Sequence, residues 1–187
     1  MTLNVVPDPP RDLAEPPADV VDTRLLRRAF GSFATGVTVV TVGGVAPHGM
    51  TANSFTSVSL DPPLVLVSVD RHAVMHRIML DSGYFAVSVL ASHQEGIARH
   101  FADRRRPLGL AQFDTVDWVP GRRTGAPLIE GALARFECEL WRTYDGGDHS
   151  IFVGNLLAMD RPGENEALLF FHGRFRQLDP ERNEMTA

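Results

Sequence analysis

A series of short strand-forming runs separated by turn residues most constrains the fold of this chain. Between residues 134 and 141, apolar and polar side chains alternate, as in an antiparallel strand with one buried face. Residues 145–148 (DGGD) then supply a hairpin turn. Further strands are expected over residues 37–42, 49–55, 64–69, 85–90, 150–159 and 168–178. So many strands with few helices predict a mainly β fold, an antiparallel barrel with peripheral α-helices.

Short helices are expected between these strands. Asp22 is a suitable N-cap for a first helix, which Gly36 would close. Its apolar residues recur at helical spacing: Leu25, Leu26, Ala29, Phe30 and Phe33. A second helix is expected over residues 72–80, and a third from a capping box at Ser92 and Glu95 to Ala102. Residues 104–127 show little periodicity and are expected to form a long loop.

Composition divides the chain into three parts. Residues 1–21 are rich in proline and are expected to form a flexible arm. Residues 22–180 would form one domain, and residues 181–187 a C-terminal tail.

Charge and composition narrow the function classes. The net charge of -5 argues against a nucleic-acid partner. The basic run at residues 104–106 is interpreted as a solvated helix end, with a phosphate contact as the alternative. The single cysteine, Cys138, lies in an alternating run and is expected to be a buried small hydrophobe. The chain shows no signal peptide and no apolar run long enough to span a bilayer, so a cytoplasmic location is expected.

The segment from Gly49 to Pro63 is rich in hydroxyl and amide side chains. Such groups suit a strand edge that faces a polar ligand. Ordinary local hydrogen bonds in a Ser/Thr-rich strand and turn are the alternative, which composition alone favours.

Five segments resemble the short-chain flavin reductase family. They are residues 33–41 (FATGVTVVT), 51–63 (TANSFTSVSLDPP), 85–90 (FAVSVL), 149–154 (HSIFVG) and 171–175 (FHGRF). The resemblance implies an FMN-binding split β-barrel of Greek-key, antiparallel topology that forms a homodimer. It implies reduction of FMN or FAD by NADH or NADPH, with the reduced flavin supplied to a separate monooxygenase.

The resemblance also assigns cofactor-binding residues. It places Thr35, Gly36 and Val37 at the rim of the flavin site. The isoalloxazine ring and ribityl chain would meet Thr51, Ala52, Asn53, Ser54 and Ser57. Ser68 and Val69 would lie near the flavin tail. Arg71 and His72 stand where the family often has small hydroxylated residues, and they would replace these near a helix N-terminus. Phe101 matches a position near the cofactor, with a core aromatic as the alternative.

Among the seven histidines, His149 is the candidate for catalysis. The resemblance places it where the nicotinamide approaches, so it would orient that ring or assist a proton transfer; a turn histidine without a role is the alternative. His172 is expected to be structural and in a strand. His72 and His76 have helical metal-pair spacing, but no carboxylate completes a motif, so no metal site is expected.

The absence of a convincing catalytic triad agrees with hydride transfer, which needs no protein nucleophile. The chain also lacks the G-x-G-x-x-G fingerprint of a Rossmann domain. Two alternatives remain: an oxidase of the pyridoxamine-phosphate type that retains FMN, and a flavin-binding protein without turnover.

Overall fold

The structure is a computed structural model that describes residues 17, 20, 22–162 and 165–178. The arm expected over residues 1–21, apart from residues 17 and 20, lies outside this range, as does the tail expected over residues 181–187. None of the described helices is both long and apolar enough to cross a membrane.

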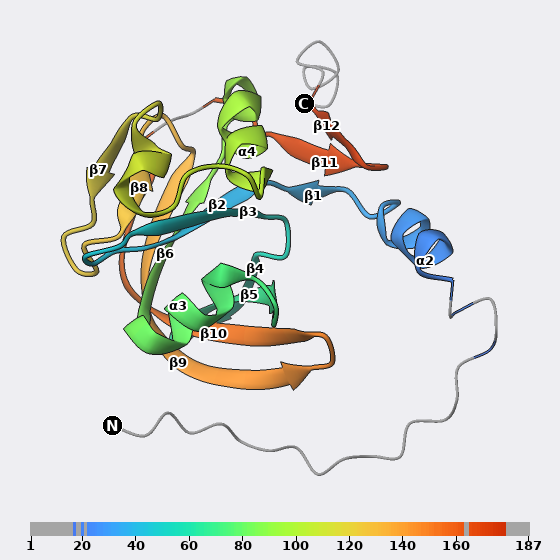
Figure 1. The fold of residues 1–187 in the computed structure, drawn as a ribbon, viewed down its shortest axis with the longest axis horizontal. Helices are drawn as coiled ribbons and strands as arrows, with labels where there is room; N and C mark the ends of the chain where they lie inside the picture. Colours follow the sequence, from blue (N-terminus) through green and yellow to red (C-terminus); the bar gives the residue numbers. More distant parts are fainter. Residues whose placement is uncertain (1–16, 18–19, 21, 163–164, 179–187) are drawn as a thin grey trace.

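A curled seven-stranded sheet forms the body of the molecule (Figure 1). Its order is β3-β2-β6-β9-β10-β5-β4, and every neighbouring pair is antiparallel. The strands are β2 (Thr38–Val42), β3 (His48–Ala52), β4 (Thr56–Leu60), β5 (Pro63–Asp70), β6 (Tyr84–Val89), β9 (Ala134–Gly146) and β10 (His149–Asp160). This confirms the mainly β, antiparallel barrel with peripheral helices.

The two edge strands of this sheet, β3 and β4, follow each other in the chain. Residues 53–55, which we call the seam, join them. At the seam, the Ser54 hydroxyl donates to the Ser68 carbonyl at 2.9 Å and accepts from the Ser68 N–H at 3.1 Å. This contact continues the β4–β5 register, in which Thr56 faces Leu66, so a short connection rather than a strand ladder links β3 to β4.

Two apolar clusters fill the two sides of the sheet. One contains Val40, Val67, Met75, Phe85 and Phe152, among others. The other is built where α4 covers the sheet, from Val37, Val39, Leu90, Ala98, Phe101 and Phe113. Cys138 is fully buried in the first cluster, as expected, and this burial raises the pKa of its thiol to about 12. The thiol is therefore neutral at neutral pH.

Helices and two small sheets surround the barrel. The helices are α2 (Thr23–Phe30), α3 (Val74–Ser82), α4 (Glu95–Ala102) and the 3₁₀ turns η1 (Ser92–Gln94) and η2 (Gly109–Phe113). The sheets are β1 (Thr35–Gly36) with β11 (Leu169–Phe171) and β12 (Arg174–Arg176), and β7 (Trp118–Pro120) with β8 (Pro127–Ile129). In Figure 1, α2 projects from the body beside β1.

The expected helix boundaries are partly wrong. Asp22 does cap α2, but the helix ends at Gly31, and Gly36 lies in β1 instead. The capping box at Ser92 is absent, because Ser92 lies inside η1 and the Ala91 N–H donates to the side chain of Gln94 at 3.0 Å. Glu95 instead pairs with Arg99 along α4. The end of this helix at Ala102 is confirmed.

Two expectations for the second half also need correction. The expected loop over residues 104–127 contains η2 and β7, because Phe113 and Val116 pack into the cluster under α4. The expected strand over residues 168–178 is a hairpin, β11 and β12. His172 is therefore in a turn, with a left-handed φ of 49°, and not in a strand.

Candidate functional site

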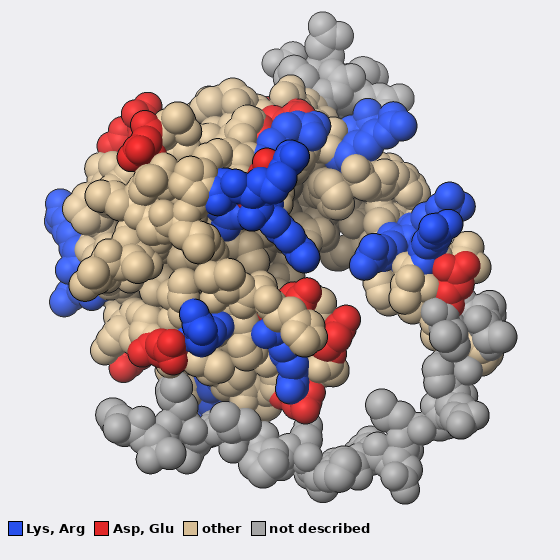
Figure 2. Space-filling model, in the orientation of Figure 1, with Lys and Arg blue, Asp and Glu red and all other residues tan. Residues whose placement is uncertain are grey.

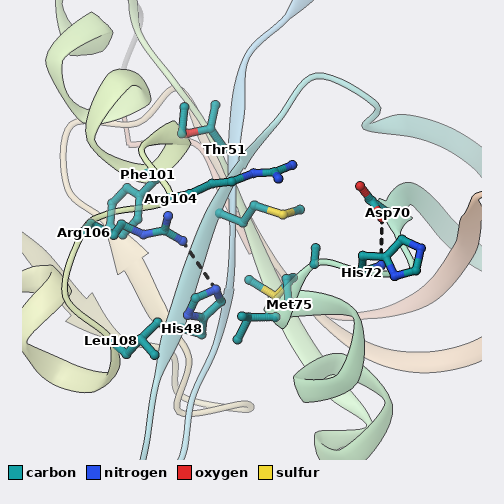
Figure 3. A pocket seen from close by; sticks show the side chains of 13 residues that line it. His48, Thr51, Asp70, His72, Met75, Phe101, Arg104, Arg106 and Leu108 are labelled. Carbon is teal, nitrogen blue, oxygen red and sulfur yellow. Dashed lines mark hydrogen bonds between the residues drawn. The ribbon is translucent and has the colours of Figure 1, made fainter.

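A pocket of about 340 Å³ opens between α3 and α4, beside β3 (Figure 3). The segment that follows α4 forms one wall of the pocket. Its lining residues are His48, Met50, Thr51, Asp70, His72, Ala73, Val74, Met75, Phe101, Ala102, Arg104, Arg106 and Leu108. In Figure 2, basic side chains border this hollow from the α4 side. The pocket thus combines an apolar floor with a cationic edge.

Arg106 holds the wall of the pocket in place. Its guanidinium donates to the Gly49 carbonyl and, at 2.8 Å, to the Asp103 carbonyl. It also lies 3.4 Å from Nε2 of His48 (Figure 3). Burial lowers the pKa of Arg106. Arg106 is thus not part of a solvated helix end, because its hydrogen bonds join the chain after α4 to β3.

Gln112 of η2 extends this hydrogen-bond network. Its amide accepts from the Gly49 N–H at 2.9 Å and donates to the Pro47 and Gly109 carbonyls at 3.0 and 2.9 Å. Burial and the neighbouring Arg106 charge lower the pKa of His48 to about 4. His48 is therefore a neutral imidazole at neutral pH.

Phe101 and Thr51 reach the pocket from α4 and β3. The Phe101 ring is fully buried and sits directly on Gly49, where an added Cβ would lie 2.6 Å from the ring. Thr51 donates its hydroxyl proton to the Ala98 carbonyl at 2.7 Å. Both residues shape the pocket, and the Phe101 ring belongs to the core.

The seam brings together a second group of predicted residues. The Asn53 amide donates to the Thr35 hydroxyl at 3.3 Å, next to the exposed Gly36. Ser54 lies beside them, but its hydroxyl is occupied by the Ser68 backbone. The side chains of three other predicted residues are buried in the core and have little surface to offer a ligand: Val37, Ala52 and Val69. Ser57 lies on the exposed edge strand β4.

Arg71 and His149 meet at the β9–β10 hairpin, away from the pocket lining. The Arg71 guanidinium pairs with Asp145 at 2.7 Å and donates to the His149 carbonyl at 3.3 Å. The His149 Nδ1 lies 2.7 Å from the carboxylate of Asp148. His149 is therefore oriented by a carboxylate, with its Nε2 left for another contact.

His72, unlike its neighbour Arg71, lines the pocket. Its backbone N–H donates to Asp70 at 2.7 Å, and it precedes α3, so it does not share a helix with His76. In the described part of the chain, no three His, Cys, Asp or Glu side chains gather into a group that would hold a metal ion.

Ten of the predicted residues therefore fall into three places: the pocket (Thr51, His72, Phe101), the seam and its neighbours (Thr35, Gly36, Asn53, Ser54, Ser68) and the hairpin (Arg71, His149). The other four lie in the core (Val37, Ala52, Val69) or on β4 (Ser57). Sequence reasoning missed His48, and it favoured a solvated helix end for the run that contains the pocket residues Arg104 and Arg106. The arginine run was visible, but its position against β3 depends on contacts that no local pattern encodes.

Comparison with known proteins gives a consistent result. Residues 30–179 match the model of the flavin reductase like domain. An NADH-dependent FAD reductase of Streptomyces globisporus is 58% identical over 175 residues, which are 92% of this chain and 96% of that protein. An NADH-dependent flavin reductase of Rhodococcus is 40% identical over 158 residues, or 82% of this chain and 85% of that one.

The fold agrees with this result as well. The crystal structure of BorF, the flavin reductase component of a bacterial two-component tryptophan halogenase, is 60% identical, with a TM-score of 0.82 over 84% of this chain and 98% of that chain. With a family match over most of its length, this chain belongs to the flavin reductase family.

Proposed function

We propose that this protein uses NADH to reduce FAD or FMN, and that the reduced flavin serves a separate monooxygenase or halogenase. The observation that carries the proposal is the 58% identity, over nearly the whole of both chains, to an NADH-dependent FAD reductase. Relatives named as reductase subunits of flavin-dependent monooxygenases support the separate partner. The names of the relatives favour NADH over NADPH.

The residues of the seam suit a flavin ring. The polar rim of such a ring carries carbonyl and imide groups, which neutral donors and acceptors match. Asn53, Thr35 and the exposed backbone of Gly36 offer such groups within one short stretch. A bound flavin supplies the hydride acceptor, and the protein aligns it with the nicotinamide.

His149 is proposed to orient the nicotinamide. The Asp148 carboxylate holds its Nδ1 side, so Nε2 is free to hydrogen-bond a substrate amide. Arg71 fixes the same hairpin by donating to the His149 carbonyl and pairing with Asp145. The ion pair between Arg71 and Asp145 thus keeps the imidazole at one position beside β5.

Mixing the purified protein with NADH and FAD or FMN, while following nicotinamide absorbance, tests the function.

His149→Asn should lower turnover or raise the KM for NADH about tenfold, with flavin affinity unchanged. His93→Asn, at an exposed position of η1, is the matched control and should change neither. Flavin that binds but is not reduced by NADH would contradict the proposal and favour the amine oxidase or the flavin carrier.

A homodimer is the second part of the proposal. α2 buries none of its side chains, and Phe30 and Phe33 are 70% and 77% exposed. Trp141 on β9 is also 44% exposed. A second copy covering these aromatic side chains would account for their presence on the surface. Light scattering at micromolar concentration should give twice the mass of one chain, and a monomer would contradict it.

A further inference from the structure

Arg104 is the pocket arginine whose guanidinium has neither an ion pair nor a hydrogen bond within the described residues. Its neighbours differ: Arg105 pairs with Asp103 at 3.2 Å and faces solvent, while Arg106 is bound to the Gly49 and Asp103 carbonyls. Figure 3 shows Arg104 extending across the pocket toward the side where Asp70 and His72 lie.

The surroundings of Arg104 favour an anion. The pocket lining contains two guanidinium groups, Arg104 and Arg106, against one carboxylate, Asp70. One oxygen of Asp70 already accepts from the His72 N–H at 2.7 Å. Met50, Met75 and Leu108 give the pocket apolar walls, which lower the local dielectric and strengthen a charge interaction. A planar guanidinium matches two phosphate oxygens at once.

Arg71, the arginine that the sequence favoured for a phosphate, is engaged elsewhere. Its guanidinium is shared between Asp145 and the His149 carbonyl, and it does not line the pocket. Using it for a ligand would break the ion pair that fixes the hairpin. Arg104 needs to break no such pair before it binds.

We propose that Arg104 binds a phosphate group of a nucleotide seated in the pocket between α3 and α4. The ligand class rests on the proposed function, since both the flavin and the nicotinamide cofactor carry phosphates. Arg106 forms the wall behind Arg104 and is a positioning residue, because its donors are directed at the protein backbone.

The test compares Arg104→Gln with Arg105→Gln, its exposed neighbour. Binding of FMN and riboflavin to the flavin-free proteins is measured by flavin fluorescence, and KM values are measured for FMN, riboflavin and NADH. Arg104→Gln should weaken FMN binding about tenfold and leave riboflavin, which has no phosphate, unchanged. Arg105→Gln should behave like the wild type, and thermal melts should show that both variants fold.

A second arm identifies the source of the phosphate. If the nicotinamide dinucleotide occupies the pocket, Arg104→Gln raises the KM for NADH about tenfold with either flavin. It then leaves the reaction with 1-benzyl-1,4-dihydronicotinamide, a hydride donor without phosphate, unchanged. In both cases added salt should weaken the wild-type interaction more than that of the variant.

Two results would overturn the inference: FMN and NADH constants within twofold of the wild type, or an equal loss for riboflavin and FMN. Failure of the proposed function has a different signature. A wild-type protein that binds FMN but does not oxidise NADH would refute the reductase activity, while the FMN and riboflavin titrations would still decide the role of Arg104.

Discussion

The regions around α4 and around α2 are completed in different ways. On the α4 side, Ala98 and Phe101 are fully buried, and Arg106 and Gln112 direct their donors at the protein's own carbonyls. On the α2 side, a helix of the same length buries no side chain, and aromatic rings and the Asn53 amide lie at the surface. The packing under α4 is therefore completed by the chain's own groups, and of the described arginines there only Arg104, at the pocket, remains unpaired, whereas the α2 region retains aromatic and amide groups suited to a ligand or another subunit.

The largest effect on stability is expected at the α4 side. Phe101→Ala removes a fully buried ring that packs on Gly49 and Phe113. The free energy of unfolding should fall by about 3–5 kcal/mol, measured by urea denaturation. A loss below about 1 kcal/mol would show that the ring contributes little to stability and that the packing under α4 is loose.

Acid should destabilise the region around α4 through His48. The pKa of His48 is lowered from its ordinary value of 6.5 to about 4 by burial and by Arg106, so the unfolded chain binds the proton more tightly. Its contribution is complete above about pH 6.5 and is lost as the pH falls toward 4, by up to about 3 kcal/mol. Unfolding of the wild type and of His48→Gln should be compared at pH 7 and pH 4.5. An equal pH dependence in both proteins would rule out His48 as the cause.

Ser54 and Asn53 are adjacent residues whose side chains are held differently, one by the backbone of Ser68 and one by a weak surface hydrogen bond. Ser54→Ala removes two hydrogen bonds to Ser68, so the free energy of unfolding should fall by about 1–2 kcal/mol. Asn53→Ala should change it by less than about 0.5 kcal/mol, because the side-chain hydrogen bond that it removes is a 3.3 Å bond at the surface. Flavin affinity should follow the opposite order, with a loss of about tenfold for Asn53→Ala. Thermal melts and fluorescence titrations of both variants would contradict this if the order were reversed.

The smallest effect on unfolding is expected for the double variant Phe30→Ser and Phe33→Ser. Both rings are mostly exposed in one chain, so the unfolding free energy of the isolated subunit should change by less than about 0.5 kcal/mol. The mass measured by light scattering should nevertheless fall to that of a monomer. Val45→Ser, at an exposed loop position away from α2, is the control and should leave the mass unchanged.

The sequence predicted the strands better than the environment of single side chains. Alternation and β-branched runs placed β2, β5, β6, β9 and β10 to within a few residues, because strand patterns are local. The position of Arg106 depends on Gly49 of β3, which is distant in sequence, so this part of the charge run was misread as solvated. Ser54 and Asn53 look equally suited to a ligand in the sequence, and only the position of Ser68 separates them.

The seam has a mechanical consequence for any ligand that enters beside it. Neighbouring strands of the seven-stranded sheet are joined by ladders, whereas the described edge strands β3 and β4 form no ladder with each other and are linked by residues 53–55. Widening the barrel at any other position would break a row of backbone hydrogen bonds. Between β3 and β4 at the seam, the described structure has no such row to break. The molecule is therefore most compliant at a single place on its circumference, and that place lies beside Asn53 and Thr35.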